Sequence, residues 1–412
     1  ITLETWDQAQ PLYGVGIPQD PGTAEEQTFA ALPGGALYFA IRAADTAGNQ
    51  GGLSNQPQAT TTGAGRTWEV RVDGSGDAPT VQAAIDSAAH GDRVLIYPGR
   101  YLEHINFKGK RIHVVSAEGP ETTILDGNGE PGSVVTFISG ETRESLLEGL
   151  TITGGRGTYL AQFDLVAGGG VRILDSSPVI KGNIIAGNIV GNTTRGYGGA
   201  ANIDSTPGKP IAQPLFYNNT ISNNEATANG GGIAAVDCQL YIGDNRFESN
   251  SCQYDGGAIY IFVGPPFLDG SLQIVGNVFL RNVAGDHGGA IEAGQGMLSP
   301  LEIRNNLFVL NEAHGKDPPG GVGTGGAISM RDWPSIISNN TFVGNIGTGT
   351  GTGSTCSGGH ILVSTDKRVE ITANIFVAAE GCALSCSAPS FDTVAEGNLY
   401  WNNDPRNIGN PR

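Results

Sequence analysis

Six side chains in the middle of this chain are of types that perform acid–base chemistry, and a repeat gives them equivalent positions. Asp255 and His287 each come directly before a pair of glycines, and Tyr260 and Glu292 each follow five residues later. Aligning the repeats on their glycines predicts one outward-facing patch from three consecutive repeats. Its members are Asp255, Tyr260, Asp286, His287, Glu292 and Arg331, with Asp332 beside them.

Two reactions suit such a patch. In β-elimination on a uronic-acid polysaccharide, a cation or Arg331 would neutralise the carboxylate, and His287, Tyr260 or Arg331 would act as base or acid. In glycoside hydrolysis, Asp286 and Glu292 would act as acid and as base or nucleophile, given a suitable separation. An interpretation without catalysis also stands, in which turn residues satisfy local backbone groups and Glu292 forms an ordinary surface ion pair with Arg331.

Two short acidic turns offer oxygen ligands of the kind that calcium requires. Asp73 and Asp77 flank one Gly-Ser-Gly turn, and Asp126 opens a second turn that runs to Glu130. Neither turn has the full EF-hand pattern, and Asp-Gly is also common turn chemistry. Calcium is therefore the one candidate cofactor, and ordinary turns are the alternative.

A diglycine followed by small or branched apolar residues occurs seven times, and it predicts the scaffold that positions these side chains. The spacing ranges from 26 to 37 residues, which is the range of repeat architectures. Paired glycines suit a corner that needs positive φ or a close approach of neighbouring backbones. The copies begin at Gly168, Gly198, Gly230, Gly256, Gly288, Gly325 and Gly358.

A second block inside each repeat predicts a short strand with one buried face. Its pattern is Asn, then an inward Ile or Phe with outward neighbours, then Asn again, as in Asn277-Val278-Phe279-Leu280-Arg281-Asn282. Stacked repeats would place Phe on Phe and Asn on Asn, and the Asn side chains could hydrogen-bond along the stack. Because parallel crossovers are right-handed, these repeats predict an all-β, right-handed parallel β-helix.

The open end of such a solenoid must be capped. Residues Pro79 to Ala89 place Val81, Ile85 and several alanines on one face and predict a short amphipathic capping helix. Strand-like runs follow at 93–97, 112–116, 134–138 and 149–153.

The segments Asp77 to Asp86 and Gly91 to Glu103 resemble the opening of the pectin-lyase-like superfamily of right-handed parallel β-helices. The later Gly-Gly-Ala-Ile and Phe-x-x-Asn pattern is similar to the repeats of the polymorphic outer-membrane proteins, whose passenger regions are surface adhesins. These resemblances cover about residues 66–403. They imply the fold but leave the function open, because the superfamily holds lyases, hydrolases, esterases, epimerases, adhesins and phage spikes.

Residues 1–63 differ from the repeats. The stretches Leu37 to Asn49 and Gly52 to Asn55 resemble the last two strands and connecting turn of a fibronectin type III module. Only the second half of such a module, a partial β-sandwich, is present, so a neighbouring chain could supply the missing strands. We expect two domains, a partial module at 1–63 and the β-helix at 64–412, within a longer extracellular protein.

Composition fits a secreted or cell-surface protein. Glycine makes up 64 of 412 residues and the net charge is −17, so nucleic acid and anionic membranes are not expected partners. No apolar run is long enough to span a bilayer. The five cysteines predict one or two disulfides, namely Cys238 with Cys252 and two of Cys356, Cys382 and Cys386, with buried thiols as the alternative.

Two functional hypotheses follow. The favoured one is a rigid structural or adhesive element whose lateral face could bind carbohydrate, because the repeat resembles adhesins and no unmistakable catalytic motif is present. The alternative is a secreted polysaccharide lyase or glycoside hydrolase acting on acidic polysaccharide at the patch around His287. In both cases the expected partners are polysaccharides or other cell-surface and matrix components.

Overall fold

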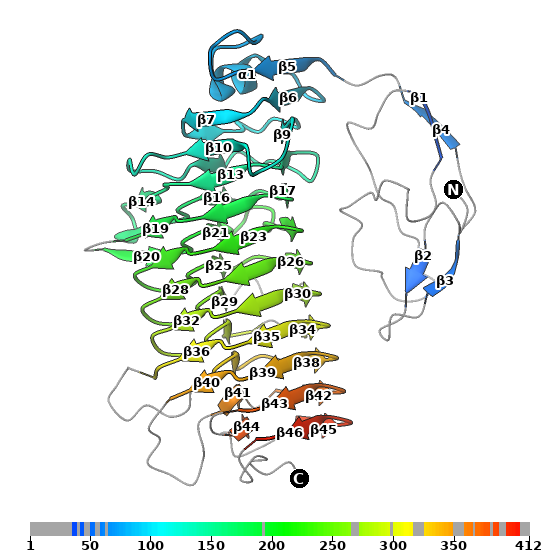
Figure 1. The fold of residues 1–412 in the computed structure, drawn as a ribbon, viewed down its shortest axis with the longest axis vertical. Coiled ribbons are helices and arrows are strands. Elements are labelled where there is room, and N and C mark those ends of the chain that lie inside the picture. Colours follow the sequence, from blue (N-terminus) through cyan, green and yellow to red (C-terminus); the bar gives the residue numbers. More distant parts are fainter. Residues whose placement is uncertain are drawn as a thin grey trace.

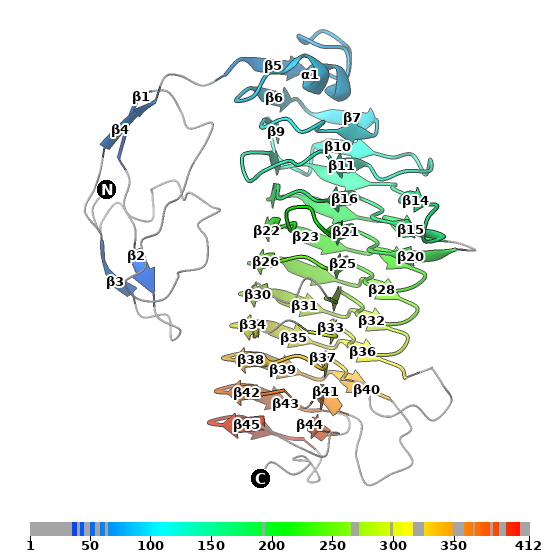
Figure 2. The same cartoon turned by 180° about the vertical axis from the view of Figure 1, so that it is seen from behind.

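The repeats wind into one column of stacked coils in the computed structural model (Figure 1). Figure 2 shows the same column from behind. The structure describes residues 65–191, 194–264, 272–296, 300–315, 325–348, 358–365, 367–379, 382–386 and 393–403. Before residue 65 it describes the backbone of four short strands.

Three long sheets run the length of the column. In the described residues the first long sheet contains β5 (Thr67–Val70), β6 (Arg93–Ile96), β9 (His113–Ser116), β12 (Leu146–Glu148), β17 (Val179–Lys181), β22 (Leu215–Tyr217), β26 (Leu240–Gly243), β30 (Leu272–Val275), β34 (Leu301–Arg304), β38 (Ser335–Ser338), β42 (Val369–Thr372) and β45 (Thr393–Glu396).

The second long sheet contains β7 (Gly99–Leu102), β10 (Thr123–Asp126), β13 (Thr151–Thr153), β18 (Ile184–Ala186), β23 (Thr220–Ser222), β27 (Arg246–Glu248), β31 (Val278–Leu280), β35 (Leu307–Val309), β39 (Thr341–Val343), β43 (Ile375–Val377) and β46 (Leu399–Trp401). The third contains β8 (Ile105–Asn106), β11 (Val135–Phe137), β16 (Val171–Leu174), β21 (Ala201–Asp204), β25 (Ile233–Val236), β29 (Ile259–Phe262), β33 (Ile291–Gly294), β37 (Ile328–Arg331), β41 (Gly358–Ser364) and β44 (Cys382–Cys386).

Two smaller sheets complete the described coils. One contains β19 (Ile189–Val190), β24 (Glu225–Ala226), β28 (Ser251–Cys252), β32 (Val283–Ala284), β36 (Glu312–Ala313) and β40 (Ile346–Gly347). The other contains β14 (Thr158–Leu160), β15 (Leu165–Ala167) and β20 (Arg195–Tyr197). A single coil runs through β26, β27, β28 and β29 and returns to the first long sheet at β30, where β26 and β30 pair in parallel. This arrangement confirms the predicted parallel β-helix.

The diglycines mark the corner that leads into the third long sheet. Gly256 has φ of 71° and Gly288 has φ of 62°, so the first glycine of each pair occupies the left-handed region. A Cβ on Gly257 would overlap the carbonyl oxygen of Gly289 in the next coil and would lie 2.7 Å from the backbone of Val283. The second glycine therefore allows neighbouring coils to stack, as the sequence pattern predicted.

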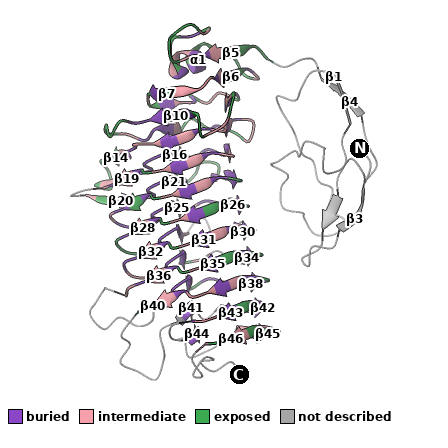
Figure 3. Cartoon of the chain, viewed as in Figure 1, coloured by how far each residue is buried: buried purple, intermediate pink, exposed green. Residues whose placement is uncertain are grey.

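The predicted ladders are present inside the column. The amide of Asn245 donates to Oδ1 of Asn277 at 3.0 Å, and the amide of Asn277 donates to Asn306 at 3.0 Å. Aromatic rings stack beside the ladder with centroids 4.8 to 5.1 Å apart, from Phe247 to Tyr400. Buried residues recur in every coil, as the colours of Figure 3 show.

One coil carries a buried histidine beside an asparagine ladder. His360 takes the place that alanine or glycine holds after the other diglycines. Its side chain is fully buried, and the Nδ2 amide of Asn345 lies 3.1 Å from its Nδ1. Ala379 takes the place of an asparagine on the next rung, and its N–H donates to Oδ1 of Asn403 at 2.8 Å. Burial lowers the pKa of His360 to about 4, so it fills the core as a neutral ring.

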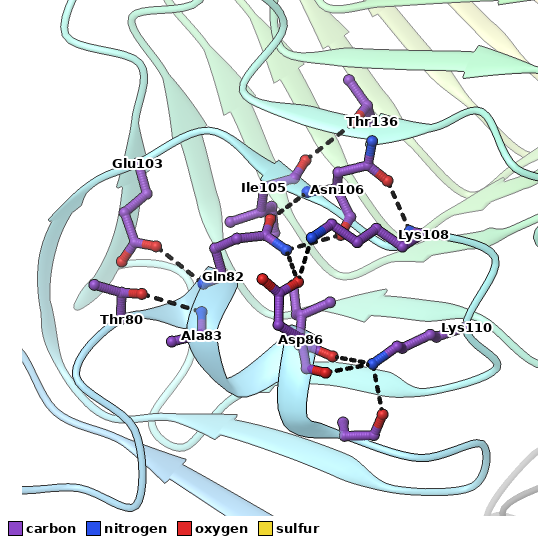
Figure 4. Close-up of polar contacts among 12 residues, drawn as sticks. Thr80, Gln82, Ala83, Asp86, Glu103, Ile105, Asn106, Lys108, Lys110 and Thr136 are labelled. Atoms are coloured by element: carbon purple, nitrogen blue, oxygen red, sulfur yellow. Dashed lines mark hydrogen bonds and ion pairs between the residues drawn. The ribbon is translucent and has the colours of Figure 1, made fainter.

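Helix α1 (Val81–Ser87) covers the first coil and buries Val81, Ala84 and Ile85. It is shorter than the predicted 79–89, because Thr80 is extended and serves as the N-cap. The first coils satisfy both helix ends, as Figure 4 shows. The Glu103 carboxylate accepts from the N–H groups of Val81 and Gln82, each at 3.0 Å. Lys110 Nζ donates to three carbonyl oxygens at the other end, at 2.7 to 2.8 Å.

The N-terminal strands form two antiparallel pairs, β1 (Gly35–Tyr38) with β4 (Gln58–Thr61) and β2 (Arg42–Ala44) with β3 (Gln50–Leu53). The remaining residues of the predicted fibronectin-like module lie outside the described part of the chain. The domain boundary at 63/64 and the partial sandwich therefore stay predictions.

The predicted pairing of Cys238 with Cys252 is wrong, because both are buried free thiols. Cys238 packs in the main core at the corner after β25, whereas Cys252 packs between Ala226 and Ala284 on β28. Different corners of one coil hold them apart. Cys382 is disulfide-bonded and Cys386 is a free thiol. Cys356, the third cysteine of that group, lies outside the described residues.

Candidate functional site

The candidate site lies on the outer face of the third long sheet. Strand register places Tyr260 of β29 beside Glu292 of β33, and Glu292 beside Ser329 of β37. The predicted residues come from three consecutive coils: Asp255 and Tyr260 from the coil of β29, Asp286, His287 and Glu292 from the coil of β33, and Arg331 from β37.

Arg331 is the centre of an ion-pair network. Its Nε donates to Glu292 Oε1 at 2.5 Å, and its Nη2 donates to Asp255 Oδ2 at 3.2 Å. Asp255 Oδ1 accepts from the backbone N–H of His287 at 3.3 Å. His287 Nδ1 lies 2.9 Å from Asp286 Oδ1, which is within ion-pair distance although the angles are not those of a hydrogen bond. We call these five residues the Arg331 cluster.

Burial within the Arg331 cluster is uneven. Glu292 is 0% exposed, whereas the side chain of Arg331 is 41% exposed. From the sequence we expected Glu292 to lie on an accessible outer surface. Its side chain is fully buried, so this expectation is wrong. Its side chain leaves the outer face of the sheet, and its register neighbour Ser329 is also 0% exposed, whereas Tyr260 on the other side is partly exposed. Substrate can reach Asp255, Asp286, His287 and Arg331 more readily than Glu292.

Burial and charge shift the pKa of several groups in opposite directions. Burial raises the pKa of Asp255 and of Glu292, even though Arg331 acts to lower both. Burial alone would lower the pKa of His287, but Asp286, Glu292 and Asp255 together raise it. Burial, with Asp255 and Glu292, also raises the pKa of Tyr260. These shifts favour the protonated forms of Asp255, Glu292 and His287 relative to ordinary side chains of the same types.

Three members of the Arg331 cluster could also hold a cation. One ligand atom from each of Asp255, Asp286 and His287 lies within 4.8 Å of the others. Two carboxylates and an imidazole suit a divalent ion, but Arg331 already lies against Asp255 and would repel one. Asp332, which the sequence added to the patch, is an exposed corner residue with φ of 53° and lies outside the ion-pair network.

The predicted calcium residues lie in the first coils, outside the Arg331 cluster, and each one contacts protein groups near it. Asp73 accepts from the backbone and the hydroxyl of Ser75, at 3.0 and 2.7 Å. Asp77 accepts from the backbone N–H of Glu69 at 2.9 Å. Asp126 forms an ion pair with Arg100. These contacts are those of turns and ion pairs, and calcium binding at these residues stays a prediction.

Sequence reasoning did not single out three further groups. Asn229 accepts from the backbone N–H of Asp255 at 3.1 Å and so fixes the corner that carries this carboxyl. Arg172 and Asp204 form a second ion pair on the same sheet at 2.6 Å, and the Arg172 side chain is only 5% exposed. Asn229 and Arg172 occupy the same aligned columns as Asp255 and Glu292, so the repeat alignment was the signal that could have found them.

Replacing Arg331 by glutamine is expected to destabilise the fold at neutral pH, because it leaves the Glu292 carboxylate buried without its partner. Breaking a buried ion pair costs about 3–5 kcal/mol, and we expect about 2–3 kcal/mol because Arg331 is partly exposed. The loss should shrink as the pH falls: the pKa of Glu292 is raised on folding, so its protonated form restores stability in acid. Chemical denaturation of the native and variant proteins at several pH values measures both effects.

The double variant Glu292→Gln with Arg331→Gln is the matched control. It removes both charges and should recover most of the lost stability with little dependence on pH. A single Arg331→Gln variant as stable as the native protein from acid to neutral pH would contradict this account of the pair.

The fold and the Arg331 cluster together define a parallel β-helix with an ionisable cluster on one outer sheet. No protein-family model matches the chain, and no curated protein matches it. Among solved structures it is similar to a Yersinia enterocolitica family 28 exopolygalacturonase, at 12% sequence identity and a TM-score of 0.34, over 90% of this chain and 81% of that chain. So low a TM-score transfers no chemistry to this chain. In the described residues no helix has the length and apolar character to cross a membrane.

Proposed function

We propose that this chain is an extracellular polysaccharide-acting protein that hydrolyses glycosidic bonds at the Arg331 cluster. The observation that carries the proposal is the pair of partly buried carboxyls, Asp255 and Asp286, whose oxygens lie within 4.8 Å. Two carboxyls in unlike environments are the basic equipment of glycoside hydrolysis. The disulfide at Cys382 supports an oxidising compartment outside the cell.

The environments of the two carboxyls suggest their roles. Asp255 is the proton donor to the leaving oxygen, because burial raises its pKa and favours its protonated form. Asp286 is the nucleophile, since His287 lies 2.9 Å away and stabilises its negative charge. One oxygen of each carboxyl lies within 4.8 Å of the other, which is compatible with the carboxyl separation of about 5–5.5 Å in retaining enzymes.

The charges of the cluster favour hydrolysis over elimination. Elimination on a uronic acid needs a cation that is available to the substrate carboxylate. Arg331 already binds Glu292 and Asp255, so the carboxyls of the cluster itself take up its charge in place of an anionic sugar. The substrate we propose is therefore a neutral or weakly charged polysaccharide, in place of the acidic polysaccharide expected from the sequence.

The adhesive or structural role remains the second candidate. Its support is the complete burial of Glu292 against Arg331, which resembles a structural ion pair more than an accessible catalytic group. In that case the outer face would bind carbohydrate without cleaving it.

A substrate panel separates the candidates. The purified chain is incubated with neutral glycans such as xylan, arabinan and β-glucan, and with polygalacturonate and alginate. New reducing ends and the ultraviolet absorbance of unsaturated products are measured together. We expect reducing ends from a neutral glycan without unsaturated product, and retained anomeric configuration by NMR of the first product.

The other outcomes each decide against hydrolysis. Unsaturated product from an acidic glycan would replace hydrolysis by elimination. Binding to an immobilised glycan without any turnover would favour the adhesive role. Neither binding nor turnover on any member of the panel would remove polysaccharide as the partner.

A further inference from the structure

The outer face of the second long sheet changes character along the column. In β27 its outward side chains are Arg246 and Glu248, which form an ion pair at 2.9 Å. From β31 onward the outward side chains are apolar in every strand, with Thr341 as the one exception. They are Val278, Leu280, Leu307, Val309, Thr341, Val343, Ile375, Val377, Leu399 and Trp401. We call these ten residues the apolar face.

The apolar face is also exposed. Leu307 is 36% exposed, Ile375 40%, Leu399 65% and Trp401 73%, and Leu310 at the edge of the face is 44% exposed. These five account for nearly half of the large apolar side chains that are exposed in the described residues. Strands β31, β35, β39, β43 and β46 lie in successive coils (Figure 1). Their outward side chains therefore follow one another along the column. Exposed apolar surfaces of this kind mark interaction sites.

We propose that the apolar face binds a second copy of this chain, face to face about a two-fold axis. Charge is the first argument. Each chain carries a net charge of −17, so two copies repel wherever acidic surfaces meet. The first long sheet carries Glu302, Glu370 and Glu396 in the same coils, the first two in ion pairs with Arg304 and Arg368, whereas no ionisable residue lies on the apolar face. Two copies can therefore approach along this face with the least repulsion.

The regular spacing of the side chains is the second argument. Register pairs Leu307 with Thr341 and Thr341 with Ile375, so each row repeats at the strand spacing of roughly 4.8 Å. Two copies have the same spacing, so the ridges of one can fill the furrows of the other along all five strands. Sheets that pack in this way lie about 10 Å apart with interdigitated side chains.

The size of the apolar face sets the strength of the contact. Five strands span roughly 20 Å and the three residues of each strand span roughly 10 Å, so the face covers about 200 Å², a quarter of the about 800 Å² per partner in a standard protein interface. We therefore expect a reversible dimer with dissociation in the micromolar range rather than a permanent one. This inference does not depend on the proposed hydrolysis, since the two surfaces lie on different sheets.

Sedimentation velocity of the whole chain from about 1 to about 200 µM tests the dimer. We expect the sedimentation coefficient to rise with concentration, and to rise more at high salt, where charge repulsion is screened. Ile375→Lys should leave the protein monomeric throughout, at least a tenfold loss of affinity. Its matched control is Ile336→Lys on β38 of the first long sheet, which lies between Glu302 and Glu370 and should dimerise as the native chain does.

Three results would overturn the inference. The first is a native chain that stays monomeric at every concentration. The second is a dimer that Ile375→Lys leaves intact while circular dichroism shows the variant folded. The third is a monomer whose apolar face instead binds neutral phosphatidylcholine vesicles, with the binding lost in Ile375→Lys.

Discussion

Replacing Gly257 by alanine is expected to cost more than about 4 kcal/mol and to unfold the coils around β29. The new Cβ would overlap the carbonyl oxygen of Gly289 and would lie 2.7 Å from the backbone of Val283. Both obstacles are backbone, so no side chain can turn away to make room. The N–H of Gly257 donates to Gly288 at 3.1 Å, and separating the coils would break this contact as well. Hydrogen exchange, followed by peptide, reports which coils lose protection.

Gly264→Ala is the matched control for this prediction. Its Cβ would meet Phe262 at 3.6 Å and Asp237 at 3.9 Å, which are ordinary contact distances. We expect a change within about 1 kcal/mol, because alanine also restricts the unfolded chain. Each coil leans on its neighbours, so the damage from Gly257→Ala should spread along the column from β29. Equal protection in both variants would show that the diglycines do not set the stacking distance.

Replacing Asp255 by asparagine is expected to lower turnover of a hydrolysed glycan by about 100- to 10,000-fold, the usual contribution of a general acid. Asparagine keeps an oxygen that can accept from Arg331, so the fold should survive, but it cannot deliver a proton. The rate of reducing-end release under saturating glycan, with the melting temperature of each variant, measures the effect.

Asp332→Asn is the control, because Asp332 follows Arg331 directly but is exposed and outside the cluster. It should stay within about twofold of the native rate, since its charge touches no reacting group. The pH profile adds a second check. The donor must be protonated, so the rate falls as pH rises through the pKa of Asp255, and losing the Arg331 charge should move that fall to higher pH. Equal losses in Asp255→Asn and Asp332→Asn would contradict the assigned role.

Most of the fold could be predicted because repetition multiplies a weak local signal. One Asn-x-Phe block is ambiguous, but the same block in successive coils leaves only stacked parallel strands with ladders such as Asn245 to Asn277. The capping helix was also visible, since its apolar positions follow helical spacing. Its ends were less clear, because Glu103 and Lys110 reach α1 from the following coils.

The sequence predicted which residues meet at the site, but it did not predict how deeply each one is buried. Aligned columns brought Asp255, Glu292 and Arg331 together, because equivalent positions in a solenoid are neighbours. The repeat pattern does not specify the complete burial of Glu292, because residues of one aligned column differ in exposure, as Glu292 and Tyr260 do. The cysteine pairing failed for a related reason: Cys238 and Cys252 are close in sequence, yet one coil sends them to different corners.

The pKa of the Asp255 carboxyl, measured by NMR on protein labelled with ¹³C at aspartate and assigned by its loss in Asp255→Asn, tests the central claim most directly. The account expects this carboxyl to titrate above the ordinary aspartate value and to titrate higher still in Arg331→Gln. A carboxyl that titrates at or below the ordinary value, and does not respond to Arg331, would contradict a proton donor at this site.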